Sequence, residues 1–346
     1  MVLSTPIYTS KWRLQIFLLL LGLLGSWANE GKTQQLPHFL GYGREQTLIH
    51  CDGLFLVHAP NRSQSHLYLW NPFLGDSSQI FPCDSIFSFE YLGIGYRKVP
   101  ANTPRNYTIL GFSGKDEGSV EILDLETCVW KKLQAKLDWL VHPSCHGLSI
   151  GGNMYWLTSS NTIQLFSFTT EEFKKLGELV FVHDEKTQAM SLSSHKGNRL
   201  SLLLQGLTGD IAFWVSSPLD DEIVSWTCLL NVSDPRIPSL GDDSVYSPHF
   251  LEKNDTIVLL SREKEEREEW DEAFLKTGDE EVSKAYISLL KINKKGVLGR
   301  VRIVETSFWH PFFCGYVYTP SLVRVPYLPH RPSHFRSECS RPLKIS

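Results

Sequence analysis

From residue 50 onward, short apolar runs alternate with clusters of glycine, proline, asparagine and aspartate. Each run is four to seven residues long and contains β-branched or aromatic side chains, which is typical of β-strands. Turn-forming clusters, such as residues 159–161 and 196–198, separate the runs. The pattern predicts strands at residues 54–57, 67–70, 120–125, 154–157, 163–168, 200–204, 211–215, 257–260 and 286–292.

The chain also repeats itself. The segment SVEILDLETCVWKKL at residues 119–133 matches TIQLFSFTTEEFKKL at residues 162–176, with an offset of 43 residues. A period of roughly 40–50 residues with several strands in each copy is typical of β-propeller blades. Residues 50–326 comprise 277 residues, so blades of about 46 residues predict an all-β propeller of about six kelch-like blades, with five or seven as alternatives.

The aromatic residues fit this architecture. Trp130 and Phe173 take the same place in the two copies, so both should be buried between neighbouring sheets. We interpret four further tryptophans of the strand-rich region as packing between blades rather than as a stacking surface for a sugar or peptide; they are Trp70, Trp156, Trp214 and Trp226.

Composition narrows the possible functions. There are 34 lysines and arginines against 38 aspartates and glutamates, so the net charge is −4 and no nucleic-acid partner is expected. The seven cysteines are isolated and form no CxxC pair, which excludes a zinc module and a dense disulfide framework. Free thiols of this kind indicate a reducing compartment.

Four segments complete the domain plan. We assign residues 29–49 to a linker, residues 50–326 to the propeller and residues 327–346 to a flexible tail. Within the propeller, residues 262–285 are dense in charges of both signs, and we expect a charged insertion there, either a solvated helix or a disordered loop.

The first 28 residues resemble an export signal. Lys11 and Arg13 precede an apolar run that begins at Leu14, and a cleavage-site-like pair of small residues ends at Ala28. The apolar run is shorter than the ~20 residues that a membrane-spanning helix needs. The segment is therefore read as a signal peptide or, alternatively, as a mispredicted exon, and contact with a membrane is expected only if the segment is used.

Several segments, in order along the chain, carry a resemblance to a known family. They include CDGLFL at residues 51–56, LWNPFLG at 69–75, YLGIGY at 91–96, HGLSIGGNMYWLT at 146–158 and YTPSLVRV at 318–325. Together they resemble the plant F-box-associated domain of the first type, a β-propeller that follows an F-box. Ser167 and the charged insertion depart from the family pattern.

The resemblance implies a non-catalytic protein-interaction module without a cofactor, similar to the substrate-recognition domain of SCF-type ubiquitin ligases. Its partner would be a protein marked for ubiquitylation, bound through loops on one face of the propeller. Nothing before Cys51 resembles the helical F-box that docks on a Skp-type adaptor. We therefore expect the 346-residue chain not to bind that adaptor.

Three groups of residues resemble chemical motifs, and we interpret each as structural. Residues 147–151 match G-x-S-x-G around Ser149, but an aromatic strand follows where a nucleophile elbow needs a helix. His142, Cys145 and His146 lack the further ligands that a structural zinc site needs, so no metal is expected. The acidic residues Asp52, Asp124 and Glu126 are explained by turns, so no catalytic residue is assigned.

The compartment has two readings. The family resemblance and the isolated cysteines favour the cytoplasm and nucleus, whereas the segment between Leu14 and Ala28 favours the secretory pathway. In the second reading the protein is a secreted or membrane-attached β-propeller glycoprotein with a binding role. Its N-glycosylation sites would then be Asn61, Asn106, Asn231 and Asn254.

Overall fold

The computed structural model folds into five antiparallel four-stranded sheets. It describes residues 47–60, 65–80, 89–100, 103–113, 119–143, 145–182, 187–220, 224–240, 248–252, 255–264, 284–307 and 321–326. The signal-like segment, nearly all of the expected linker and the tail lie outside these residues.

Each sheet is a simple meander in which consecutive strands pair. Sheet 1 contains β1 (Thr47–Cys51), β2 (Leu54–Pro60), β3 (Ser65–Asn71) and β4 (Asp76–Ile80). Sheet 2 contains β5 (Tyr91–Tyr96), β6 (Tyr107–Phe112), β7 (Val120–Asp124) and β8 (Val129–Leu133). Sheet 3 contains β9 (Leu148–Ile150), β10 (Asn153–Leu157), β11 (Thr162–Ser167) and β12 (Glu172–Glu178). Sheet 4 contains β13 (Thr187–His195), β14 (Arg199–Gly206), β15 (Ile211–Ser216) and β16 (Trp226–Val232). Sheet 5 contains β17 (His249–Leu251), β18 (Ile257–Lys264), β19 (Lys284–Asn293) and β20 (Gly296–Ser307).

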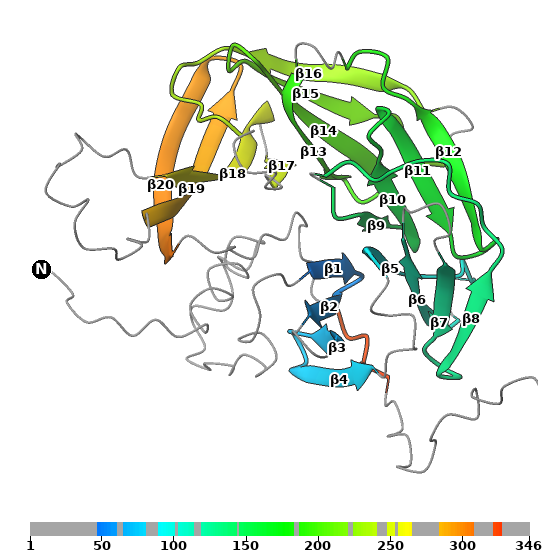
Figure 1. The fold of residues 1–346 in the computed structure, drawn as a ribbon. Coiled ribbons are helices and arrows are strands. Elements are labelled where there is room, and N and C mark those ends of the chain that lie inside the picture. Colours follow the sequence, from blue (N-terminus) through cyan, green and yellow to red (C-terminus); the bar gives the residue numbers. More distant parts are fainter. Residues whose placement is uncertain are drawn as a thin grey trace, which may run out of the picture.

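The sheets follow one another around a common centre, as the blades of a propeller do (Figure 1). The first strand of each sheet is innermost, since β1 contacts β5, β5 contacts β9, β9 contacts β13 and β13 contacts β17. The fourth strand of each sheet lies at the outer edge (Figure 1). The predicted propeller is confirmed. Within the described residues it has five blades, the lower of the two alternatives to six.

The estimate of six relied on an even period, and the period is uneven. The first strands of successive sheets start at residues 47, 91, 148, 187 and 249, so the spacings are 44, 57, 39 and 62 residues. The two long spacings include residues 134–147 and 233–248, which link one sheet to the next. An average of about 46 residues therefore overestimated the number of sheets.

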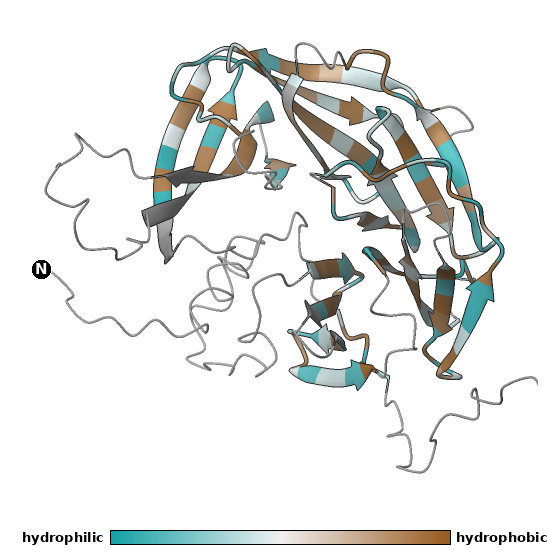
Figure 2. Cartoon of the chain, viewed as in Figure 1, coloured by the Kyte–Doolittle hydropathy of each residue, from teal (hydrophilic) through white to brown (hydrophobic). Residues whose placement is uncertain are grey.

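All nine predicted strands are present, and they are second and third strands of their sheets. These central strands form continuous apolar runs because both of their faces are buried, as in β6, where all six residues are buried. In the outer strands β4 and β8 only Ile80 is buried, and Figure 2 shows β4 mostly in pale or teal colours and the lysines of β8 in teal. The charged insertion is shorter than expected, because β18 continues to Lys264 and β19 begins at Lys284.

Buried side chains form two clusters. The larger runs through sheets 1, 2 and 3 into the inner strands of sheet 4, and the smaller joins sheets 4 and 5. Residues 321–326, which follow the last sheet, return to sheet 1, where Val323 and Val325 pack against the larger cluster. Among the described residues there is no helix that is long and apolar enough to cross a membrane.

Candidate interaction surfaces

The propeller has two faces that differ in the connections they carry. Because neighbouring strands are antiparallel, the turns after the first and third strands of a sheet lie on one face, which we call the turn face. The turns after the second strands and the links between sheets lie on the other, the connector face. Backbone hydrogen bonds agree with this division, since Leu219 N of the β15–β16 loop donates to Asn198 O of the β13–β14 turn (2.9 Å).

On the turn face, one loop reaches three other sheets. This loop joins β5 to β6 and spans residues 97–106, of which 101 and 102 lie outside the described residues. Its cations pair with Asp52 of sheet 1 through Arg105, with Glu171 of sheet 3 through Arg97 (2.5 Å), and with Asp220 of sheet 4 through Lys98 (3.6 Å). The loop thus covers part of the turn face and ties four sheets together.

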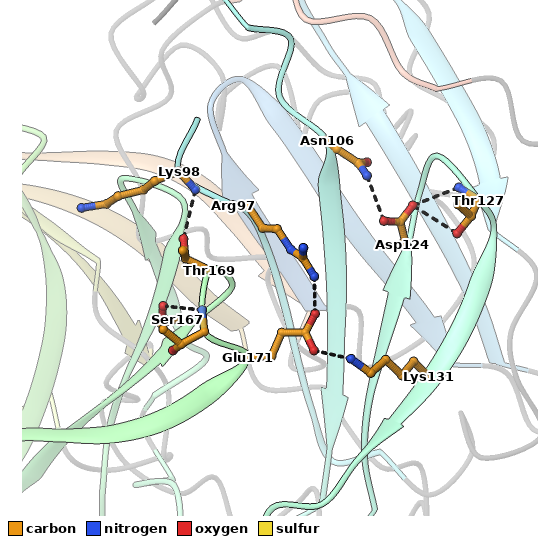
Figure 3. A network of polar contacts seen from close by, with 10 residues as sticks. Arg97, Lys98, Asn106, Asp124, Thr127, Lys131, Ser167, Thr169 and Glu171 are labelled. Carbon is orange, nitrogen blue, oxygen red and sulfur yellow. Dashed lines mark hydrogen bonds and ion pairs between the residues drawn. The ribbon is translucent and has the colours of Figure 1, made fainter. Parts of the chain in front are cut away.

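Glu171 is the most heavily bonded of these carboxylates (Figure 3). It receives Arg97 on one oxygen and Lys131 of β8 on the other, both at 2.5 Å. The hydrogen bond from Lys131, together with that from Arg97, lowers the pKa of Glu171 although partial burial raises it. Beside it, Lys98 N donates to Thr169 Oγ1 (3.1 Å). Sheets 2 and 3 are therefore joined by both ionic and neutral contacts.

Arg105 also lies over the ring of Tyr96, 4.5 Å from its centroid, in addition to its pairing with Asp52. Tyr96 in turn contacts Tyr107 edge-on, with ring centroids 5.5 Å apart. Burial raises the pKa of both phenols, so they stay protonated at neutral pH. This corner of the molecule is a packed joint between sheets 1 and 2.

The turns after the third strands of sheets 1, 2 and 3 share one design. Asn71, Asp124 and Ser167 each end a third strand, and the side-chain oxygen of each accepts a backbone N–H two or three residues further on. The backbone carbonyl of each of these three residues also accepts the N–H of the residue four positions later, and that residue has a left-handed backbone conformation. Asp124 and Glu126 are thus turn residues, as expected. Ser167 accepts a backbone N–H in this turn as Asp124 does in its own.

The G-x-S-x-G motif does not form a nucleophile elbow. Ser149 lies in β9, and Gly151 and Gly152 turn the chain directly into β10. The side chain of Ser149 hydrogen-bonds to Cys51, and burial raises the pKa of that thiol. Neither residue has the environment of an activated nucleophile.

The residues considered for a metal lie in the link between sheets 2 and 3. Cys145 N donates to His142 O (2.9 Å), and the buried Cys145 sulfur accepts Leu157 N (3.3 Å). Burial raises the pKa of the Cys145 thiol. In the part of the chain that the structure describes, no group of three or more His, Cys, Asp and Glu side chains is placed to hold a metal ion.

The tryptophans divide by burial. Trp70 and Trp156 are buried, whereas Trp130, Trp214 and Trp226 are half-buried and pack against the larger cluster. Phe173 is half-buried as well, and its ring packs against another sheet, with its centroid 5.4 Å from that of Phe112 in β6. Neither Phe173 nor Trp130 is fully buried as predicted, and one ring contact of Trp130 is with Phe89, which precedes its own sheet (6.0 Å).

Two of the four glycosylation sequons lie in described residues. Asn106 Nδ2 donates to Asp124 Oδ2 (2.9 Å), and the following Tyr107 and Thr108 are buried. Asn231 lies exposed on the outer strand β16. Asn61 and Asn254 lie outside the described residues.

The connector face exposes aliphatic side chains. Leu140, Val180 and Leu207 are 57%, 79% and 67% exposed, and they come from the links after sheets 2 and 3 and from the β14–β15 turn. The backbone around them is held by hydrogen bonds, since Ser159 N donates to Leu140 O and Leu179 N to Asn161 O, both at 2.9 Å.

Sequence reasoning missed the ionic residues of the turn face. Arg97, Lys98 and Arg105 lie in a loop whose sequence, RKVPANTPR, shows a concentration of positive charge between two strands. That concentration could have indicated an ionic role. The partners could not be found in the same way, because they come from three distant turns.

Comparison with known proteins now identifies the family. Residues 34–325 match the F-box associated beta propeller domain. The chain belongs to this family. It is 38% identical over 305 residues to a putative F-box protein of Arabidopsis thaliana, with 81% of this chain and 76% of the relative covered. It is 33% identical to the putative F-box only protein 15 of the same plant, with 81% and 75% covered.

The chain is less similar to proteins of solved structure than to these plant relatives. The Aleuria aurantia lectin in complex with a fucosylated sugar is 9% identical, with a TM-score of 0.39 and coverage of 77% of this chain and 79% of that chain. The plant relatives thus give the family, as the motifs between residues 51 and 325 predict.

Proposed function

We propose that this F-box associated propeller is a non-catalytic module that recognises a protein partner through its connector face. The observation that carries the proposal is the contrast between the two faces. The turn face is covered in part by the 97–106 loop, whose three cations are paired with carboxylates of the chain itself. The connector face presents Leu140, Val180 and Leu207 at 57–79% exposure, whereas Phe73 and Val99 on the turn face are each only 37% exposed. Exposed aliphatic side chains on rigid loops favour protein contacts.

The relatives suggest what kind of partner this is. Their printed names identify them as F-box proteins, and by family resemblance their propellers select proteins for ubiquitylation. We infer that this chain selects its partner in the same way and performs no chemistry on it. Failure to bind a Skp-type adaptor remains a prediction for the 346-residue chain, to be tested by pull-down with purified components.

Introducing negative charges at the exposed aliphatic positions tests the proposal. Leu140→Asp combined with Val180→Asp should remove the proteins that co-purify with the tagged wild-type chain from plant cells. The matched control is Leu298→Asp combined with Val301→Asp on β20, where the two side chains are 56% and 61% exposed. Thermal unfolding shows whether both variants stay folded. Loss of the same proteins from both variants, or from neither, would contradict the assignment of the connector face.

We also propose a cytoplasmic and nuclear location. The buried Cys51 and Cys145 and the exposed Cys128 and Cys228 are all free thiols, and free thiols fit a reducing compartment. The test is digestion of the C-terminally tagged chain from plant cells with a glycosidase that removes N-linked sugars. A shift in mobility would place the chain in the secretory pathway instead.

A further inference from the structure

Residues 321–326 dock on sheet 1 through the side chain of one residue. Asn71 Nδ2 donates to Ser321 O (3.0 Å) and to Val323 O (2.6 Å), across separations of 250 and 252 residues. Figure 1 shows this segment, in red, beside β3 and β4. We call residues 321–326 the closing segment.

Both polar atoms of the Asn71 carboxamide are fully hydrogen-bonded. Asn71 is completely buried, and its Oδ1 accepts Phe73 N (2.9 Å) and Leu74 N (3.3 Å). Those two bonds fix the orientation of the carboxamide, so that both N–H groups point to the closing segment. Both carbonyl oxygens lie within 3.0 Å of a single nitrogen, closer together than the ~6.6 Å between alternate carbonyls of an extended strand. Val323 N also donates to Ser321 Oγ (3.3 Å). This contact therefore recognises a main chain that bends between residues 321 and 323, whatever its side chains are.

Side chains add selectivity along the segment. At residue 321 the space is small, since a Cβ on Gly53 would lie 2.5 Å from Ser321 Oγ. Val323 and Val325 pack inward against the larger cluster, whereas Leu322 is 78% exposed. Arg324 is also exposed, with its guanidinium 3.9 Å from Asp76. The site thus fits a small residue followed by aliphatic residues at the second and fourth positions after it.

The closing segment is not a strand of the sheet. Sheet 1 has four strands, and no described strand pairs with residues 321–326. The segment is held by the Asn71 carboxamide and by two valines rather than by a ladder of backbone bonds. A ligand held in this way can leave without disrupting the pairing of the four strands.

We propose that Gly53, Asn71 and Asp76 form a peptide-binding site, which the closing segment occupies and which also accepts a separate peptide of the pattern small–x–aliphatic–x–aliphatic. This site lies at the β1–β2 and β3–β4 turns, on the turn face, and is therefore distinct from the connector face assigned to partner recognition. In this structure the site is occupied by the closing segment of the same chain. The first test is competition between that segment and a peptide of the same pattern.

Limited trypsin digestion of the full wild-type chain measures this competition. Cleavage after Arg324 requires the closing segment to leave its site, and cleavage after Lys196, in an exposed turn of sheet 4, serves as the internal reference. The competitor is the peptide YTPSLVQV, which carries glutamine in place of arginine and resists trypsin. Millimolar peptide should accelerate cleavage after Arg324 several-fold and leave cleavage after Lys196 unchanged. An unchanged rate after Arg324 would overturn the proposal, as would equal acceleration at both sites.

Variants test the role of Asn71 directly. In the full chain carrying Val323→Asp and Val325→Asp, the closing segment should be displaced, and fluorescein-labelled YTPSLVQV should bind with a rise in anisotropy. Adding Asn71→Asp removes both donated hydrogens and should weaken that binding at least tenfold. A folded double-valine variant that fails to bind the peptide would overturn the proposal. If that variant does not fold, the digestion of the wild-type chain still decides.

Discussion

The interface between sheets 2 and 3 differs from that between sheets 4 and 5 in the chemistry that holds it. Between sheets 2 and 3 lies an aromatic cluster of six rings, with neighbouring centroids 4.8–6.1 Å apart. Its members are Phe112, Trp139, Trp156, Phe166, Phe168 and Phe173. Aromatic rings in edge-on contact give large apolar burial with specific geometry.

Between sheets 4 and 5 the central residue is polar. His249 of β17 is 1% exposed, and its two ring nitrogens each lie 3.3 Å from a serine hydroxyl, Ser201 on Nε2 and Ser191 on Nδ1. Phe213 meets the imidazole edge-on at 5.5 Å, and aliphatic side chains fill the rest. One interface therefore depends on shape, and the other depends on satisfied hydrogen bonds.

The largest effect is expected from Trp156→Ala in the aromatic cluster. Trp156 is fully buried and contacts Phe112 and Phe173. Its removal should lower the free energy of unfolding by about 3–5 kcal/mol, the range for aromatic truncation in a core. Denaturant unfolding measures this loss. The control is Trp226→Ala on the outer strand β16, where the half-buried ring should cost less; equal losses would refute the special role of the cluster.

A single methyl group at Gly95 should disturb the same interface. An added Cβ would lie 2.3 Å from Gly152 O and 2.4 Å from the ring of Phe168, so sheets 2 and 3 would have to separate. We expect Gly95→Ala to cost about 3 kcal/mol, the upper end for overpacking. In the control Gly177→Ala, the added Cβ has no atom within 4 Å. Similar unfolding free energies for the two variants would argue against this close approach.

The polar interface should respond to His249→Ala. The substitution leaves the Ser191 and Ser201 hydroxyls without their histidine partner in a buried place, and we expect a loss of about 2 kcal/mol. Ser201→Ala removes only one of the two contacts and should cost less. Chemical unfolding of both variants checks the order. If His249→Ala were neutral, packing by aliphatic side chains alone would hold sheets 4 and 5.

The two interfaces also differ in how well the sequence predicts them. Phe173 stands out in the sequence because it aligns with Trp130 in the repeat, and Trp156 because it lies in the apolar run predicted as the strand at residues 154–157. His249 and Ser191 lie in first strands, which none of the nine predicted strands includes. The first strand β13, for example, carries the buried polar residues Ser191, Ser193 and His195, so it lacks a continuous apolar run. Hydrophobic periodicity therefore predicts the central strands best.

Contacts between distant turns could not be predicted from sequence at all. Trp130 and Phe173 are aligned correctly, yet both are only half-buried, because the outer strands β8 and β12 each expose one face. Lys131 and Glu171 are 40 residues apart and meet because of the way sheets 2 and 3 lie side by side. The Asn71 contact with residues 321 and 323 likewise needs the ring of sheets to bring the two ends together.

The smallest effect is expected at the ionic joint on the aromatic interface. Glu171→Gln keeps the size of the side chain but removes the charge that Arg97 and Lys131 share. Both cations are mostly exposed, so solvent screens the pairs and the loss of unfolding free energy should stay below about 1 kcal/mol. The control is Glu178→Gln, which breaks the ion pair between Glu178 and Lys175. Both residues lie in β12, so this pair does not connect two sheets.

Acid should reveal the same joint in the wild-type chain. Because the folded state holds the pKa of Glu171 below its ordinary value of 4.5, this carboxylate stabilises the fold above pH 4.5, and the contribution is lost as the pH falls through the folded-state pKa. Glu171→Gln lacks this contribution at every pH. The stability difference between wild type and Glu171→Gln should therefore shrink as the pH is lowered from 6 to 3, and 0.5 M salt should shrink it at pH 7 as well. A difference that is independent of both pH and salt would show that packing of the side chain, and not its charge, joins sheets 2 and 3 at this turn.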